Sequence, residues 1–239
     1  VGAGQYTNVL ETFPLTVNGK NGLQIMGAGR DATIIDAKSN NRSMVFLNSN
    51  GRVVVADLAV MGGRTNSAGG NGSGAGLYFL NCGDVMVSGC TVASNQCIDT
   101  GSAYGAGLLA QGSAVVVSNC FFNGNMADGS GNGYGYGGAL SILSGTMRVI
   151  DTIIANNRAT AVGKVAYGAA LYNAGWTEVR NCLVRGNSGA YTNGGAIYSG
   201  GGGLQIIGST LAYNGVVCIV RNAGTFAATN TILWGNVDD

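Results

Sequence analysis

Tyr136-Gly137-Gly138-Ala139-Leu140 begins a segment that ends with Ile154-Ala155-Asn156-Asn157, and near copies of this segment recur along the chain. Each opening consists of a glycine, two small residues and a Leu or Ile. Each copy closes about 20 residues later with an apolar residue, two variable residues and an asparagine. The openings lie at residues 74–77, 105–108, 137–140, 168–171 and 194–197, and the endings at 92–95, 122–125, 154–157, 184–187, 211–214 and 233–236. This internal repetition decides the fold.

The repeat contains short β-rich runs and no helical pattern. Val115-Val116-Val117 and Met147-Arg148-Val149 are typical of these runs. Strands that recur without an intervening helix can bury the same face in every copy by stacking as coils about 4.8 Å apart. The sequence therefore predicts an all-β fold, a parallel β-helix of about nine coils that forms a single domain over residues 1–239.

Stacked coils place equivalent side chains in files along the axis. The asparagines that close each copy are expected to form a ladder of side-chain amide hydrogen bonds. A second file lies two residues before the apolar residue of each ending, and we assign to it Cys90, Cys120, Thr152, Cys182, Thr210 and Thr231. This file is expected to fill the interior.

The six cysteines include no C-x-x-C pair, which disfavours zinc and redox motifs. They are Cys82, Cys90, Cys97, Cys120, Cys182 and Cys218. We expect buried thiols that pack as small apolar groups. A disulfide between Cys90 and Cys120 is the alternative, because stacked Cα atoms lie within disulfide range, and Cys82 and Cys97 could also meet.

Composition excludes several classes of protein. Only 10% of the residues are charged and 46% are hydrophobic, which disfavours disorder, and the net charge of +1 predicts no nucleic-acid partner. No apolar run reaches the roughly 18 residues of a membrane-spanning helix. The lack of histidine removes His-based triads and most zinc hydrolases. Because the chain starts at Val1 and stops abruptly after Asp239, we expect it to be a piece of a longer secreted protein.

Loops between one ending and the next opening should leave the coils at the same corner and stack into one face. Tyr104, Tyr136 and Tyr167 each precede a glycine opening, which predicts a column of three tyrosines, with Tyr134 and Tyr191 nearby. Aromatic rings pack against the apolar patches of sugars, and phenols add hydrogen bonds. The column is therefore either packing that covers the corner or a glycan-binding platform, and both readings stay open.

Acidic residues are too few for a clear catalytic site. Asp99 and Asp128 share the loop face, with Arg64, Arg158 and Lys164 near it. A lyase-type site needs several clustered acids for calcium and a basic residue. We expect solvated charges on flexible loops, assign no catalytic residue, and predict no metal or cofactor, with Ca²⁺ as the alternative.

The paired motifs Gly-Gly-Ala-Leu (137–140) and Gly-Gly-Ala-Ile (194–197), together with Phe122-Asn123-Gly124-Asn125, resemble the repeats of bacterial polymorphic outer-membrane proteins. The chain as a whole resembles the single-stranded right-handed β-helix of the pectate-lyase-like superfamily. The resemblance implies a right-handed solenoid and an extracellular or cell-surface location. It implies little about activity, because this fold carries lyases, esterases, adhesins and capsule-binding proteins.

We therefore predict a non-catalytic extracellular scaffold or adhesin-like segment. Its loop face would contact a polysaccharide or surface glycan, through Tyr104, Tyr134, Tyr136, Tyr167, Tyr191, Asp99 and Asp128. One alternative is a polysaccharide lyase or glycoside hydrolase. Another is a filament subunit that self-associates through its coil ends. We predict neither a nucleic-acid partner nor a membrane-spanning segment.

Overall fold

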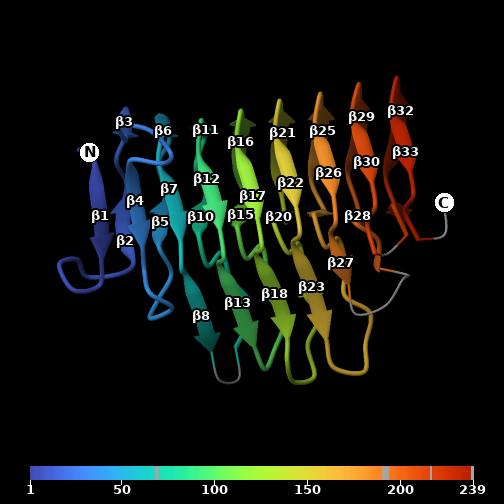
Figure 1. Ribbon diagram of the computed structural model, residues 1–239, viewed down its shortest axis with the longest axis horizontal. Helices are drawn as coiled ribbons and strands as arrows, with labels where there is room; N and C mark the ends of the chain where they lie inside the picture. The colour runs from blue at the N-terminus through green and yellow to red at the C-terminus, as the bar shows by residue number, and fades with distance from the viewer. Residues whose placement is uncertain (68–69, 190–193, 216, 238–239) are drawn as a thin grey trace.

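The computed structural model describes residues 1–67, 70–189, 194–215 and 217–237, and every named element in these ranges is a β-strand. The chain winds from one end of the molecule to the other as stacked coils, with its termini at opposite ends (Figure 1). No helix long and apolar enough to cross a membrane occurs in the described ranges. The prediction of an all-β parallel solenoid is confirmed.

Three parallel sheets form the walls of the solenoid. Sheet 1 consists of β1 (Gly4–Thr7), β4 (Thr33–Asp36), β7 (Ala59–Met61), β12 (Thr91–Ala93), β17 (Phe121–Asn123), β22 (Ile153–Ala155), β26 (Leu183–Arg185), β30 (Thr210–Ala212) and β33 (Ile232–Trp234). Sheet 2 consists of β2 (Leu15–Asn18), β5 (Met44–Leu47), β10 (Leu77–Leu80), β15 (Leu108–Gln111), β20 (Leu140–Ile142), β24 (Leu171–Asn173), β28 (Ile197–Ser199) and β31 (Ile219–Arg221). Sheet 3 consists of β3 (Leu23–Met26), β6 (Arg52–Ala56), β11 (Asp84–Ser88), β16 (Ser113–Ser118), β21 (Gly145–Ile150), β25 (Trp176–Arg180), β29 (Gly203–Ile207) and β32 (Thr225–Thr229).

Two smaller parallel sheets project from one corner. Sheet 4 consists of β8 (Arg64–Ser67), β13 (Gln96–Asp99), β18 (Met126–Gly129), β23 (Arg158–Ala161) and β27 (Ser188–Gly189). Sheet 5 consists of β9 (Gly72–Ser73), β14 (Ala103–Tyr104) and β19 (Gly135–Tyr136). We call sheets 4 and 5 together the annex. Each coil runs through sheets 1, 2 and 3, and the coils that start at β7, β12, β17, β22 and β26 insert annex strands between sheet 1 and sheet 2.

The described residues complete slightly fewer coils than the nine expected, because sheet 1 has nine strands but sheets 2 and 3 have eight each.

The alternation of side chains along each strand determines which residues form the core. In β16, for example, Val115 and Val117 point inward and are buried, whereas Val116 is half-exposed. The interior is continuous and contains the stacked pair Phe46 and Phe79, whose ring centroids are 4.9 Å apart. Burying one such side chain contributes roughly 1.5–3 kcal/mol.

The corner between sheet 3 and sheet 1 has a left-handed backbone at each turn after the first one, which connects β3 to β4. The residues at this position have φ between +49° and +62°, and they are Asp57, Gly89, Asn119, Asp151, Asn181, Gly208 and Asn230. Glycine, asparagine and aspartate tolerate this region better than other residues, so the corner sequence follows from its geometry.

This register corrects one assignment of the inward file. Arg180 pairs with Ile207, and the backbone N–H of Cys182 donates to Ser209 Oγ at 3.1 Å. Ser209 therefore continues the file after Cys182. Thr210 instead pairs with Leu183 in sheet 1, so assigning Thr210 to the file was wrong by one residue.

The asparagine ladder is confirmed at the corner between sheet 1 and the annex. Asn125 Nδ2 donates to Asn157 Oδ1 at 2.9 Å, and Asn157 Nδ2 donates to Asn187 Oδ1 at 3.0 Å. The same bond links the other neighbours in the file Asn95, Asn125, Asn157, Asn187, Asn214 and Asn236. The ladder closes the solenoid core where the chain leaves it for the annex.

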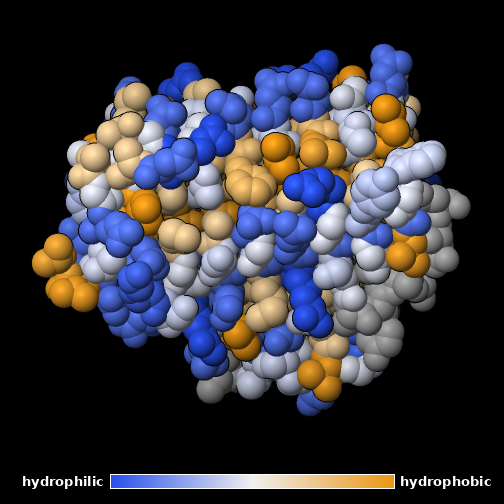
Figure 2. Space-filling model, viewed as in Figure 1, coloured by the Kyte–Doolittle hydropathy of each residue, from blue (hydrophilic) through white to orange (hydrophobic). Residues whose placement is uncertain are grey.

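Apolar side chains also lie on the outer face of sheet 1. Phe121, Ile153 and Leu183 are paired neighbours on this face, and Ile153 is 40% exposed. Figure 2 shows hydrophobic residues gathered across the middle of the face in view, between hydrophilic ones.

Candidate functional site: the tyrosine cluster beside the annex

The predicted loop face is built from strands rather than flexible loops. Sheets 4 and 5 enclose a small core of their own, which includes Ala75, Cys97, Ala103, Ala106 and Ala127. Alanine and glycine dominate because the two sheets lie close together. A Cβ added at Gly135 would lie 2.4 Å from the carbonyl oxygen of Thr160. The annex thus holds its outward side chains on stacked strands.

The predicted tyrosine column exists. Tyr104 pairs in register with Tyr136, and their ring centroids are 4.7 Å apart with an interplanar angle of 3°. Tyr136 in turn bridges to Tyr167, with ring centroids 5.3 Å apart. Tyr134 packs against Tyr136 and Tyr167 in tilted contacts at 5.9 and 5.8 Å. Tyr191 lies outside the described residues.

Two further tyrosines, not anticipated from the sequence, complete the site. Tyr172 in β24 and Tyr198 in β28 point outward from sheet 2 and stack on each other at 5.8 Å. Tyr172 meets the edge of Tyr136 at 4.7 Å, and Tyr198 contacts Tyr167 at 4.6 Å. Both tyrosines directly follow the Leu or Ile of a glycine opening, and this shared position could have predicted that they stack. We call Tyr104, Tyr134, Tyr136, Tyr167, Tyr172 and Tyr198 the tyrosine cluster.

The hydroxyl groups of the tyrosine cluster are available to a ligand. All six residues are half-buried, and none of their hydroxyls has a hydrogen-bond partner among the described residues. Ser141 Oγ is the only buried side-chain oxygen or nitrogen in those residues that lacks a partner, so the phenolic oxygens reach solvent. Burial raises the pKa of Tyr136, Tyr172 and Tyr198 above the ordinary value of 10.0, so these phenols remain protonated donors to higher pH than a free tyrosine does.

The two candidate aspartates do not form a pair. Asp99 faces the interior of the annex with no exposed surface, and its Oδ1 accepts the backbone N–H of Gly101 at 3.0 Å. The expectation of a solvated charge on a flexible loop is wrong for Asp99, because β13 alternates and turns this residue inward. Asp128 pairs with Ile98 on the half-exposed side of sheet 4.

The candidate basic residues are also dispersed. Lys164 Nζ lies 4.7 Å from the ring centroid of Tyr134 and donates to the carbonyl of Asn132, so it borders the tyrosine cluster. Arg158 is exposed on β23 in sheet 4, in register with Met126. The described residues contain no group of three or more Cys, Asp or Glu side chains that could hold a metal ion.

The cysteines are buried free thiols, as expected. Cys90 and Cys120 stack, with the backbone N–H of Cys90 donating to Cys120 Sγ at 3.5 Å, and they form no disulfide. Cys82 lies in the solenoid core and Cys97 in the annex core, so these two do not meet.

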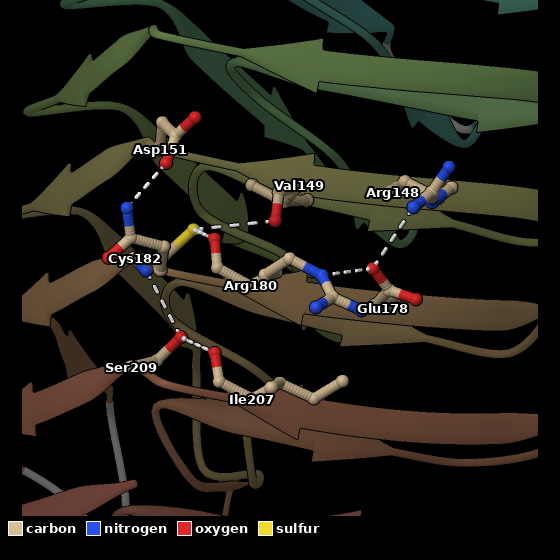
Figure 3. A network of polar contacts seen from close by, with 9 residues as sticks. Arg148, Val149, Asp151, Glu178, Arg180, Cys182, Ile207 and Ser209 are labelled. Carbon is tan, nitrogen blue, oxygen red and sulfur yellow. Dashed lines mark hydrogen bonds and ion pairs between the residues drawn. The ribbon is translucent and has the colours of Figure 1, made fainter. Parts of the chain in front are cut away.

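A charged network crosses sheet 3 away from the tyrosine cluster (Figure 3). Glu178 Oε1 accepts from Arg180 Nε at 2.9 Å and from Arg148 at 3.3 Å, and Glu178 is only 7% exposed. The hydrogen bond from Arg180 holds the pKa of Glu178 below its ordinary value. Two cations on one carboxylate oxygen tie β21 to β25, which is a structural arrangement rather than a reactive one.

Sequence comparison agrees with the observed topology. The family model described as a right-handed β-helix region matches residues 21–211, from just before β3 to β30. No curated protein and no solved structure matches the chain.

Proposed function

Because the chain belongs to the family of right-handed β-helix regions, we propose that it is a non-catalytic scaffold outside the cell or on its surface that binds a carbohydrate through the tyrosine cluster. The observation that carries this proposal is the set of six tyrosines in mutual contact whose hydroxyls have no protein partner. Packing alone accounts for the ring contacts. The six phenols that reach solvent supply the donors and acceptors that a ligand would use.

The arrangement of the rings favours an extended ligand. Parallel stacking sets neighbouring tyrosines in sheet 5 about 4.8 Å apart along the solenoid axis. Many ring faces are already covered by neighbouring rings, so ring edges and hydroxyls form most of the available surface. A chain of sugar units offers hydroxyls along its length, which suits a row of phenolic hydroxyls.

The test compares glycan binding of the parent with that of two kinds of variant. Tyr136→Phe with Tyr167→Phe keeps the rings and removes two hydroxyls, and each change is expected to weaken binding about tenfold. Tyr213→Phe changes a 65% exposed tyrosine outside the cluster and is expected to have no effect. A parent that binds nothing on a broad carbohydrate array contradicts the proposal. Binding that survives both Phe changes and Tyr136→Ala also contradicts it.

The lyase or hydrolase alternative receives no support from a specific contact. Asp99 and Asp128 lie on opposite sides of sheet 4, and no second acid accompanies either one in sheet 4 as described. Self-association through coil ends stays a prediction. Sedimentation velocity over a range of protein concentrations tests it, and a monomer at every concentration contradicts it.

A further inference from the structure

A polar hollow lies where the annex begins. The turn from β4 to β5 connects sheet 1 directly to sheet 2, whereas the next coil inserts β8 and β9 at the same corner. The first annex strand therefore stands beside a short turn, and the step between them leaves a hollow of about 420 Å³. Its lining includes Asn40, Asn41 and Arg42 from the turn, and Arg64 and Asn66 from β8.

The lining carries two positive charges and no carboxylate. Neither Arg42 nor Arg64 forms an ion pair with any described residue. Asp36, the last residue of β4, already binds Lys38 Nζ at 2.7 Å. Two half-buried guanidinium groups beside one cavity repel each other and lose part of their hydration, which an anion in the cavity would offset.

Both arginines are anchored to the same turn. The backbone N–H of Arg64 donates to the carbonyl of Asn41 at 2.8 Å, and Asn41 Oδ1 accepts the backbone N–H of Arg42 at 2.8 Å. Asn41 Nδ2 holds the turn by donating to the carbonyl of Phe13 at 3.0 Å. The two side chains thus start from a fixed frame.

Arg42 is also held along its side chain. Its Nε donates to the carbonyl of Ser73 at 2.6 Å, and its Cζ lies 5.8 Å from the ring centroid of Tyr78. These contacts use one of its five N–H donors, and its terminal amino groups bond to no described residue. Arg64 makes no side-chain hydrogen bond to any described residue. The donors that remain open match the geometry of oxyanions.

We infer that this hollow is a binding site for an oxyanion, the phosphate, sulfate or carboxylate group of a larger ligand. Arg42 and Arg64 donate to its oxygens, and the amide groups of Asn40 and Asn66 border it. The site is independent of the tyrosine cluster and does not rest on the function proposed for that cluster.

The experiment follows the Arg Nε–Hε signals of the ¹⁵N-labelled parent by NMR at constant ionic strength. Inorganic phosphate, sulfate and acetate are each titrated in exchange for chloride. Saturable shifts of the Arg42 and Arg64 signals with at least one oxyanion support the site. The oxyanion that binds most tightly shows whether the ligand carries a phosphate, a sulfate or a carboxylate group. Shifts that do not saturate, or that Arg158 shows equally, overturn it.

Variants at Arg64 test the assignment, because this side chain makes no hydrogen bond or ion pair with any described residue. Arg64→Gln is expected to weaken binding about tenfold or more, and Arg64→Lys to weaken it less, since the charge remains but the planar fork is lost. Arg158→Gln, on the same face of sheet 4 and outside the hollow, is the matched control and should bind like the parent. Unchanged affinity in Arg64→Gln overturns the inference. Should that variant fail to fold, the titration of the parent still decides.

Discussion

Asn157 makes hydrogen bonds within its own coil and to both neighbouring coils. Its Oδ1 accepts the backbone N–H of Asn125 at 3.0 Å, and its Nδ2 donates to Asn187 Oδ1 and to the carbonyls of Phe122 and Ala155. The side chain has no exposed surface. No other residue type of similar size offers an acceptor and two donors in this geometry, which is why the repeat closes with asparagine.

Replacing Asn157 should be costly. Asn157→Ala leaves buried donors and acceptors on both adjacent coils without partners, so we expect the free energy of unfolding to fall by about 3 kcal/mol. Asn157→Asp should cost at least as much, because it removes the donors and buries a carboxylate. Urea denaturation measures both effects. Asn222→Ala, at an exposed asparagine, is the control, and equal losses at the two positions would refute the role of the ladder.

Buried thiols should make the stability fall at high pH. Burial raises the pKa of Cys97 and Cys182 from 9.0 to about 11. A raised pKa stabilises the folded state fully below pH 9, and this contribution is lost as the pH rises through 11. Each thiol should contribute about 2 kcal/mol to the loss. Urea denaturation between pH 8 and 11 tests this, and Cys97→Ala should lose less stability than the parent. Identical pH profiles would rule the effect out.

Among the elements, the annex differs most from the sequence-based expectation. Its segments were expected to be flexible loops, and they form two parallel sheets with an alanine-rich core. Glycine-rich segments such as 126–136 give little strand signal, because alternation of alanine with glycine or aspartate lacks large apolar residues. Strand formation here depends on pairing with the annex strands of neighbouring coils. The sequence pattern of a single segment does not reveal this pairing.

Overpacking should loosen the annex without unfolding the solenoid. Ala127 in β18 is fully buried between the sheets, so Ala127→Leu should cost about 1–3 kcal/mol. Hydrogen exchange should accelerate in β18 and β19 and stay unchanged in β16 and β17. Ala227→Leu, at an exposed position of β32, is the control. Unchanged exchange in β18 and β19 would show that the alanine core does not hold the annex together.

Across the whole molecule, the repeat predicted the coil order, the ladder and the tyrosine column, because files of equivalent residues follow directly from register. The incorrect assignment of Thr210 shows the limit of this reasoning. Ser209 lies two residues before Leu211, as the other members of the file lie before their apolar residues, but Thr210 was chosen by residue type, so the assignment slipped by one position. Tyr172 and Tyr198 were missed because their contacts join sheet 2 to sheet 5, and sequence spacing within one coil does not reveal which outer faces meet.

Duplicating one whole coil should give a folded protein. A second copy of residues 126–157 inserted after Asn157 repeats one strand of each sheet from 1 to 5 and supplies one more ladder asparagine. We expect a parent-like circular dichroism spectrum and a melting temperature no lower than that of the parent. A duplication of residues 145–157, which repeats β21 and β22 but supplies no strand for sheet 2, is the control and should aggregate. Equal behaviour of the two insertions would contradict the modular architecture.

The asparagine ladder also has a direction. In every pair the amide nitrogen faces the coil nearer the C-terminus and the amide oxygen faces the coil nearer the N-terminus. The small dipoles of the side-chain amides therefore add head to tail, and each bond polarises the next. The molecule thus contains a row of aligned amide dipoles beside its apolar interior. Reversing a single amide would place two oxygens face to face on one side and two NH₂ groups on the other, so the row can reverse only as a whole.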